Sequence, residues 1–144
     1  LLFLINFFLA NNKNVILVCK EIEKKNDFFY FVKKNFEVYL TGSQLDIKDI
    51  KEIIDLCPKA QNKINDSKIE VFYELCLGSS LIISNDTGPA HIAGLSNKHL
   101  IWLANDNKIS KSCYPLGENV HKIFAADVKT IKTKQVIEKI EKLI

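Results

Sequence analysis

The residues of this chain best suited to chemistry lie in one stretch of ten, 84–93, with the sequence SNDTGPAHIA. The run SLII at 80–83 precedes it and predicts a buried strand, while AHIAGL at 90–95 predicts the first turns of a helix. A small polar turn with a glycine therefore joins the carboxyl end of a strand to the start of a helix, which is where α/β proteins bind ligands. Amide N–H groups and the positive end of the helix dipole at such a turn suit an anion, most often a phosphate.

The segments that must position this turn alternate between strand and helix patterns. Apolar and β-branched runs predict further strands at 15–19, 36–41, 99–104 and 120–125. Helical spacing of apolar residues predicts helices at 21–35, 46–56 and 69–77 and a terminal helix with Thr133 as N-cap, and a polar loop is expected at 105–112. This alternation predicts the α/β class, with a parallel sheet covered by helices on both faces.

Length, composition and charge narrow the classes of protein that this chain fits. Its 144 residues suffice for a domain with its own core, and we expect a single domain over 1–144. The content of 47% hydrophobic and 26% charged residues is ordinary for a globular protein. The net charge of +3 is spread along the chain, which argues against nucleic acid as a partner and fits mild attraction to anionic ligands or membrane surfaces.

The cysteines and the amino-terminal segment bear on location. The four cysteines form no C-x-x-C pair, and neither they nor the histidines are spaced as zinc ligands, so we expect a reduced, cytoplasmic chain without a metal site. The chain has no methionine, and we expect a processed product or a piece of something longer. Residues 1–10 are strongly apolar but too short to span a bilayer as a helix. We interpret them as a core element, or one whose covering partner is cut away, rather than as a secretory signal.

The stretch 84–93 closely resembles the D-T-G-x-x-H signature of bacterial heptosyltransferases, the family 9 glycosyltransferases of lipopolysaccharide core assembly. The resemblance runs from about Phe36 to the end of the chain and includes VYLTGSQLD at 38–46, the helix and strand at 70–83, and PLG at 115–117. Members have the GT-B architecture of two Rossmann-like halves, with the nucleotide-sugar donor held mainly by the C-terminal half. The resemblance implies that this chain is such a Rossmann-like C-terminal half, with residues 1–35 divergent or truncated.

Carried over residue by residue, the resemblance assigns roles within the turn. The backbone N–H groups around Thr87 and Gly88, with the Thr87 hydroxyl, would hold the donor diphosphate. Gly88 would let the backbone approach the ligand closely, since it has no Cβ. Pro89 would fix the turn near the first helical position, where its missing N–H costs nothing. Asp86 would accept hydrogen bonds from sugar hydroxyls.

Three further residues complete the implied donor site. His91, one turn into the helix, would support the phosphate or the turn, and a buried structural hydrogen bond fits it equally well. Gly42 would turn the chain after the strand at 36–41. Asp46 would bind the ribose, although an acid at a helix N-terminus is the more frequent reason for such a residue.

Structural alternatives stand beside these roles. Asp86 and Thr87 fit a helix cap that binds no ligand, but capping does not explain the further match at Pro89 and His91. Trp102 is expected in the core rather than stacked on an adenine. His99 and His121 are expected as surface or strand residues.

The chain also departs from the family pattern. The strand at 99–104 lacks the Phe-Gly turn at its end, and NDS at 65–67 stands where a glycine is expected. The family's catalytic base belongs to the N-terminal half, so no catalytic residue is assigned here.

The implied function is transfer of a sugar from a nucleoside diphosphate donor, ADP-heptose being the family's best-known one, to a lipopolysaccharide core or related saccharide or lipid-linked acceptor. No metal or other cofactor is implied. Such a protein would be cytoplasmic, with peripheral contact at the inner membrane face left open. The alternative is a non-catalytic or degenerate nucleotide-binding or interaction module of the same fold.

Overall fold

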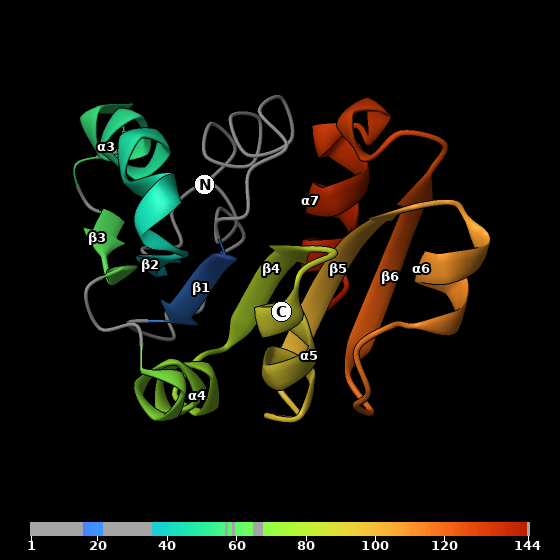
Figure 1. The fold of residues 1–144 in the computed structure, drawn as a ribbon, viewed down its shortest axis with the longest axis horizontal. Helices are drawn as coiled ribbons and strands as arrows, with labels where there is room; N and C mark the ends of the chain where they lie inside the picture. The colour runs from blue at the N-terminus through green and yellow to red at the C-terminus, as the bar shows by residue number, and fades with distance from the viewer. Residues whose placement is uncertain (1–15, 22–35, 57, 59, 65–67, 144) are drawn as a thin grey trace.

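The structure is a computed structural model, and it describes residues 16–21, 36–56, 58, 60–64 and 68–143 (Figure 1). The strands are β1 (Ile16–Glu21), β2 (Phe36–Thr41), β3 (Ala60–Asn62), β4 (Leu81–Asn85), β5 (His99–Asn105) and β6 (Val120–Ala125). The helices are α3 (Ile47–Leu56), α4 (Ile69–Leu77), α5 (Gly88–Gly94), α6 (Lys108–Ser112) and α7 (Thr133–Glu141), with short 3₁₀ turns η1 (Gln44–Asp46) and η3 (Val128–Thr130). The helix predicted at 21–35 and the apolar segment 1–10 lie outside the described residues.

The six described strands form one sheet in the order β3-β2-β1-β4-β5-β6. β2 pairs in parallel with β3, and β4, β5 and β6 pair in parallel with one another. β1 lies antiparallel between β2 and β4, so those two strands share one direction and five strands end at the same edge. The predicted α/β sheet of parallel strands is confirmed, with β1 as an antiparallel insertion that an apolar run, equally buried in either direction, does not reveal.

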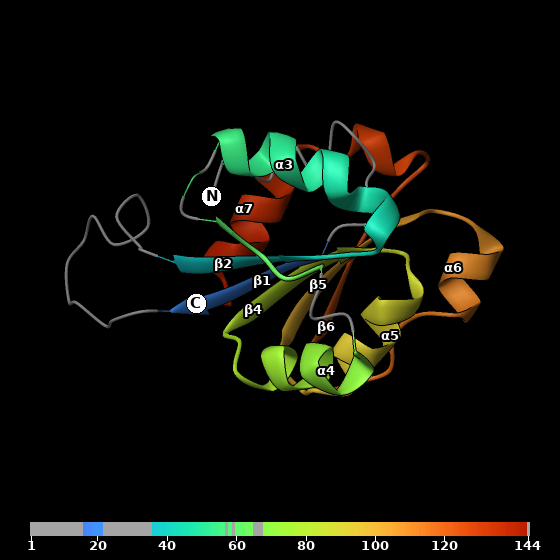
Figure 2. The same ribbon diagram turned by 60° about the vertical axis from the view of Figure 1, so that its left-hand side comes forward.

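Helices cover both faces of the sheet, as predicted, with α3 and α7 on one side and α4 and α5 on the other (Figure 2). Alternation along β4 supplies both layers: Leu81 and Ile83 pack into the core under α3 and α7, and Ile82 packs into the core over α4 and α5. Every residue of β4 is buried, as expected for a central strand covered on both sides. Trp102 of β5 is fully buried and meets Phe124 edge to face, which confirms its core position.

Two short elements differ from the sequence prediction. β3 has three residues at the sheet edge, of which only Ala60 is buried, so it carries no alternating pattern. α6 forms within the predicted polar loop 105–112, where the Asn107 side chain accepts a hydrogen bond of 2.9 Å from Ser110 N and caps the helix. Isolated helices of this length are unstable, so α6 depends on its cap and its contacts with the rest of the fold.

Smaller differences concern helix starts and cysteines. The terminal helix is confirmed as α7, but its N-cap is Lys132 rather than Thr133, and the Lys132 N–H donates to Gln135 Oε1 at 2.8 Å. Cys76 is buried, and burial raises the pKa of its thiol to about 12, as suits a core cysteine, whereas Cys113 is exposed. Within the described part of the chain, no helix has the length and apolar character needed to cross a membrane.

Candidate functional site

A pocket of about 740 Å³ lies at the edge where β2 and β4 end. The turn after β2 contributes one wall, the turn after β4 with the start of α5 contributes a second, and α4 closes a third. Its lining consists of Thr41, Gly42, Ser43, Asp46, Lys63, Ile69, Val71, Phe72, Glu74, Leu75, Asp86, Thr87, Pro89 and Ile92. Figure 2 shows the starts of α3 and α5 at this same end of the sheet. Because β1 separates β2 from β4, the two turns lie about two strand spacings apart, roughly 10 Å.

The turn after β4 presents its side chains to this pocket. Thr87 is the N-cap of α5, yet its side chain makes no capping hydrogen bond, and its Oγ1 lies 3.5 Å from Ser84 Oγ. Asp86 is exposed and lines the pocket, and Pro89 lies in the first turn of α5 as predicted. The capping alternative therefore does not account for the Thr87 hydroxyl, and Thr87 is a residue of the pocket lining.

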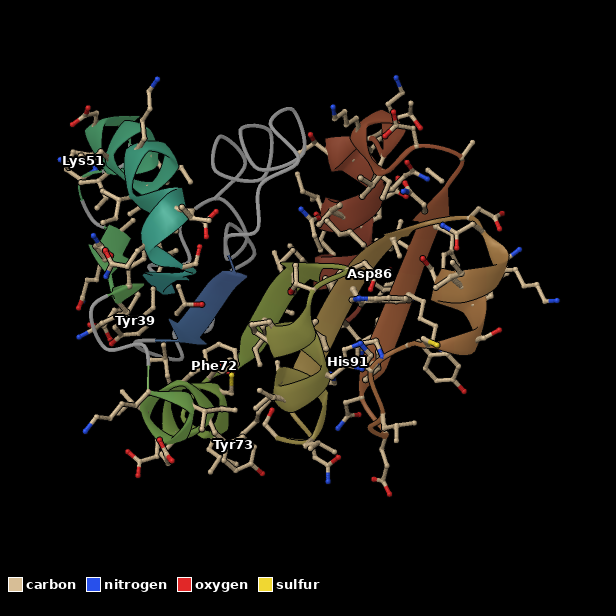
Figure 3. All side chains as sticks on the ribbon, in the orientation of Figure 1. Tyr39, Lys51, Phe72, Tyr73, Asp86 and His91 are labelled. Carbon is tan, nitrogen blue, oxygen red and sulfur yellow. The ribbon has the colours of Figure 1, made fainter. Side chains whose placement is uncertain are left out.

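Gly88 and His91 lie on α5 outside the pocket lining. A Cβ built on Gly88 meets no described atom within 4 Å, so packing gives no reason for glycine at this position. His91 is half-buried, and Figure 3 shows it farther along α5 than the Asp86 turn. The donor-binding roles of both residues stay predictions.

Gly42 and Asp46 form a tight corner at the opposite wall. The Asp46 Oδ2 atom accepts hydrogen bonds of 2.7 Å from both the backbone N and the Oγ of Ser43. A Cβ on Gly42 would lie 3.0 Å from that same oxygen, so glycine permits the close approach. Asp46 is only 6% exposed and holds the turn in the way expected of an acid at a helix start. Its ribose-binding role stays a prediction. That role requires Asp46 to lie at the pocket, and Asp46 is a residue of the lining.

Two parts of the pocket were not predicted from the sequence. Lys63 follows β3, and its backbone N donates to Leu40 O at 2.9 Å, which fixes it beside the end of β2. The α4 wall supplies Ile69, Val71, Phe72 and Leu75, and Figure 3 shows Phe72 on this helix. Ile69 is 55% exposed and Val71 is 40% exposed, whereas a helix that only covers a sheet keeps its outer face polar. Apolar residues around most of α4 were the signal that could have identified this wall.

The charges of the lining define what the pocket can hold. The lining includes three acidic residues, Asp46, Glu74 and Asp86, and one basic residue, Lys63, whose Nζ lies 5.9 Å from the centroid of the Tyr39 ring. Carboxylates accept hydrogen bonds from sugar hydroxyls, while an ammonium and backbone N–H groups suit phosphate oxygens. An apolar wall beside these groups suits the flat face of a base. Among the described residues, no group of three or more His, Cys, Asp or Glu is placed to hold a metal ion.

His99 and His121, both on strands as expected, form a pair that the sequence did not predict. The Nδ1 atom of His99 lies 3.1 Å from Nε2 of His121, and neither residue belongs to the pocket. The pKa of His121 is lowered from 6.5, chiefly because burial disfavours the charged ring, with the positive charges of His99 and Lys139 adding to the effect.

Stability is expected to fall as the pH decreases through the ordinary histidine pKa of 6.5. The unfolded chain takes up a proton at His121 more readily than the folded chain, so the contribution is complete above this pH and is lost below it. Urea unfolding at pH 8, 7, 6 and 5.5 measures this, with His121→Gln expected to lose less stability over the same range. Equal losses in the two proteins would show that His121 is not responsible.

Comparison with known proteins bears on the fold. No protein-family model matches the sequence, and no curated protein matches it. The solved structure of E. coli ADP-heptose LPS heptosyltransferase II superposes with a TM-score of 0.64 at 20% identity, over 73% of this chain and 35% of that one. This chain thus spans about a third of that protein. The CMP N-glycosidase BcmB of Clostridium botulinum superposes with a TM-score of 0.38 at 16% identity, over 70% of this chain and 97% of that one. The chain therefore has a Rossmann-like α/β fold that matches part of a GT-B glycosyltransferase.

Proposed function

We propose that this chain binds the nucleoside diphosphate-sugar donor of a glycosyltransferase reaction, with an ADP-sugar as the first candidate. The observation that carries the proposal is the pocket itself, which joins Gly42 and Asp46 after β2 to Asp86 and Thr87 after β4. These turns are at least 40 residues apart in the sequence, and the fold places both on one cavity at the carboxyl ends of parallel strands.

The lining supports one orientation of the donor. The diphosphate would lie at the start of α5, against the Thr87 hydroxyl and the N–H groups of Thr87 and Gly88, with Lys63 as an added positive charge. The base would lie on the apolar wall of α4, and Asp86 would accept hydrogen bonds from the sugar. In a direct displacement at the anomeric carbon, the N–H groups at the start of α5 and the Lys63 ammonium would stabilise the leaving diphosphate as its negative charge grows.

Sugar transfer to an acceptor is a further part of the proposal. The acceptor would be a lipopolysaccharide core, a related saccharide or a lipid-linked saccharide. The catalytic base of the reaction would come from an N-terminal half. The reaction would need no metal or cofactor and would take place in the cytoplasm or at the inner membrane face. A module that binds nucleotide without transfer is the alternative, and failure of transfer after addition of such a half would favour it.

The test is a calorimetric titration of the folded chain with ADP, UDP and GDP and then with the sugar forms of the nucleotide that binds. Selective binding of one diphosphate supports the proposal and identifies the base. Absence of binding by a chain with a cooperative thermal transition contradicts it. Binding that survives replacement of both Asp86 and Thr87 by alanine would place the ligand outside this pocket.

Asp86→Asn is expected to weaken binding of the nucleotide-sugar by about tenfold or more, because a charged acceptor strengthens hydrogen bonds from hydroxyls. The affinity for bare nucleoside diphosphate is expected to change by less than about twofold. Calorimetry with both ligands measures the two changes. Asp55→Asn is the matched control, since Asp55 is exposed on α3 outside the pocket. An equal loss of affinity for both ligands would show that Asp86 does not contact the sugar.

A further inference from the structure

A serine outside the pocket contacts the carboxylate that we place against the sugar. Ser110 Oγ donates a hydrogen bond of 2.9 Å to Asp86 Oδ2, across 24 residues of sequence. Ser110 is on α6 and is only 3% exposed, whereas Asp86 is exposed. The contact therefore joins a fixed, buried donor to the inner side of a side chain that otherwise reaches solvent.

Ser110 is itself held in place by the turn that begins α6. Its backbone N donates to Asn107 Oδ1 at 2.9 Å, and Lys111 N donates to Asn107 O at 3.1 Å. The preceding residue, Asp106, pairs with the Lys111 ammonium, and its backbone N donates to Ala125 O of β6 at 2.7 Å. Ser110 is thus held to the ends of β5 and β6, and not by the turn that carries Asp86.

The two oxygens of Asp86 are consequently in different situations. Oδ2 is occupied by Ser110, while Oδ1 makes no hydrogen bond with any other residue in the described part of the chain. An exposed aspartate without this contact would sample several rotamers and would lose that freedom on binding a ligand. The Oδ2 contact with Ser110 favours one rotamer of Asp86, a residue that also lines the pocket.

We infer that Ser110 is a positioning residue that orients the Asp86 carboxylate toward the sugar of the donor, and so raises selectivity for nucleotide-sugar over bare nucleotide. This inference depends on the proposed function, because it assigns Asp86 to the sugar. Ser110 does not line the pocket, so it acts only through Asp86. α6, an element that the sequence did not predict, thereby becomes part of the donor site.

The test compares Ser110→Ala with Ser112→Ala in the full chain. Ser112 is the matched control, because it is on the same helix, is exposed and donates to Lys108 O at 2.8 Å, away from Asp86. Calorimetry gives the dissociation constants of the selected nucleoside diphosphate and its sugar form for each variant. Ser110→Ala is expected to weaken the sugar form by about fivefold, the net worth of a typical hydrogen bond, and to leave the bare diphosphate unchanged.

A double-mutant cycle separates positioning from a general loss of structure. In an Asp86→Ala background, Ser110→Ala is expected to have no further effect on the sugar form, since the residue through which it acts is gone. Equal weakening of both ligands, a Ser112→Ala effect of the same size, or a full Ser110→Ala effect in the Asp86→Ala background would overturn the inference. The inference would also be overturned if the Ser110→Ala protein kept the wild-type preference for nucleotide-sugar over bare nucleotide. A wild-type chain that binds neither ligand overturns the proposed function together with this inference, whereas the preceding outcomes overturn the inference alone.

Discussion

Gly88→Val is expected to weaken binding of the nucleoside diphosphate by more than about a hundredfold, or roughly 2.8 kcal/mol, while the chain stays folded. A Cβ at position 88 meets no described atom within 4 Å, so the substitution has space in the unliganded protein. A phosphate held by the N–H groups of Thr87 and Gly88 would have to approach the backbone at this point, and the branched side chain would obstruct that approach. Calorimetric titration measures the affinity, and a thermal melt verifies the fold.

Two further variants make this prediction specific. Gly88→Ala carries a smaller obstruction and is expected to give an intermediate loss. Gly78→Ala is the matched control, because Gly78 at the end of α4 lies outside the pocket and its added Cβ would make ordinary contacts of 3.6 Å and 3.7 Å. Unchanged affinity in a folded Gly88→Val protein would show that the diphosphate does not bind at this turn.

Gly94→Ala is expected to lower the free energy of unfolding by about 2–4 kcal/mol, which is in the range of severe overpacking in a core. Gly94 ends α5 and is buried, and a Cβ there would lie 2.5 Å from Leu116 O and 3.1 Å from Pro115 Cβ. Two of the three obstructing atoms belong to the backbone of Leu116, which cannot move away as easily as the end of a flexible side chain. Urea unfolding at neutral pH measures the loss.

The neighbouring loop has little freedom to relieve this contact. Gly117 has φ +152°, where L side chains are rare, and its own added Cβ would contact Gly94 O. Each glycine thus permits the close approach of the other, and Gly117→Ala is expected to be at least as damaging. Gly78→Ala again serves as control, with a change within about 0.5 kcal/mol expected for a substitution that meets only ordinary contacts. A stable Gly94→Ala protein would show that the loop at 115–117 can move away.

These two predictions assign different reasons to glycines in the same short helix. Gly94 is explained by packing, because its added Cβ is obstructed within the protein. Gly88 is explained by nothing in the described structure, and close approach of a ligand is the reason that the D-T-G-x-x-H resemblance supplies. The contrast between stability lost at Gly94 and affinity lost at Gly88 separates a structural glycine from a functional one.

The sequence alone determined the local features of this protein. The apolar run before residue 84, the Pro near the start of α5, and the helical spacing in 46–56 and 69–77 predicted elements that the structure contains. It also predicted the α/β class and the polar turn that now lines the pocket. These features follow from residues close together in the chain, through hydrophobic periodicity and turn chemistry, which is why they could be predicted.

Only the tertiary structure decided how distant segments meet. It placed β1 antiparallel between β2 and β4, added β3 at the edge, and brought Lys63 and α4 to the pocket. It also formed α6 and set Ser110 against Asp86. An apolar run has the same pattern in either strand direction, and elements of three or five residues are stabilised by long-range contacts rather than by their own propensity. Such contacts depend on the whole chain folding together, and no local pattern encodes them.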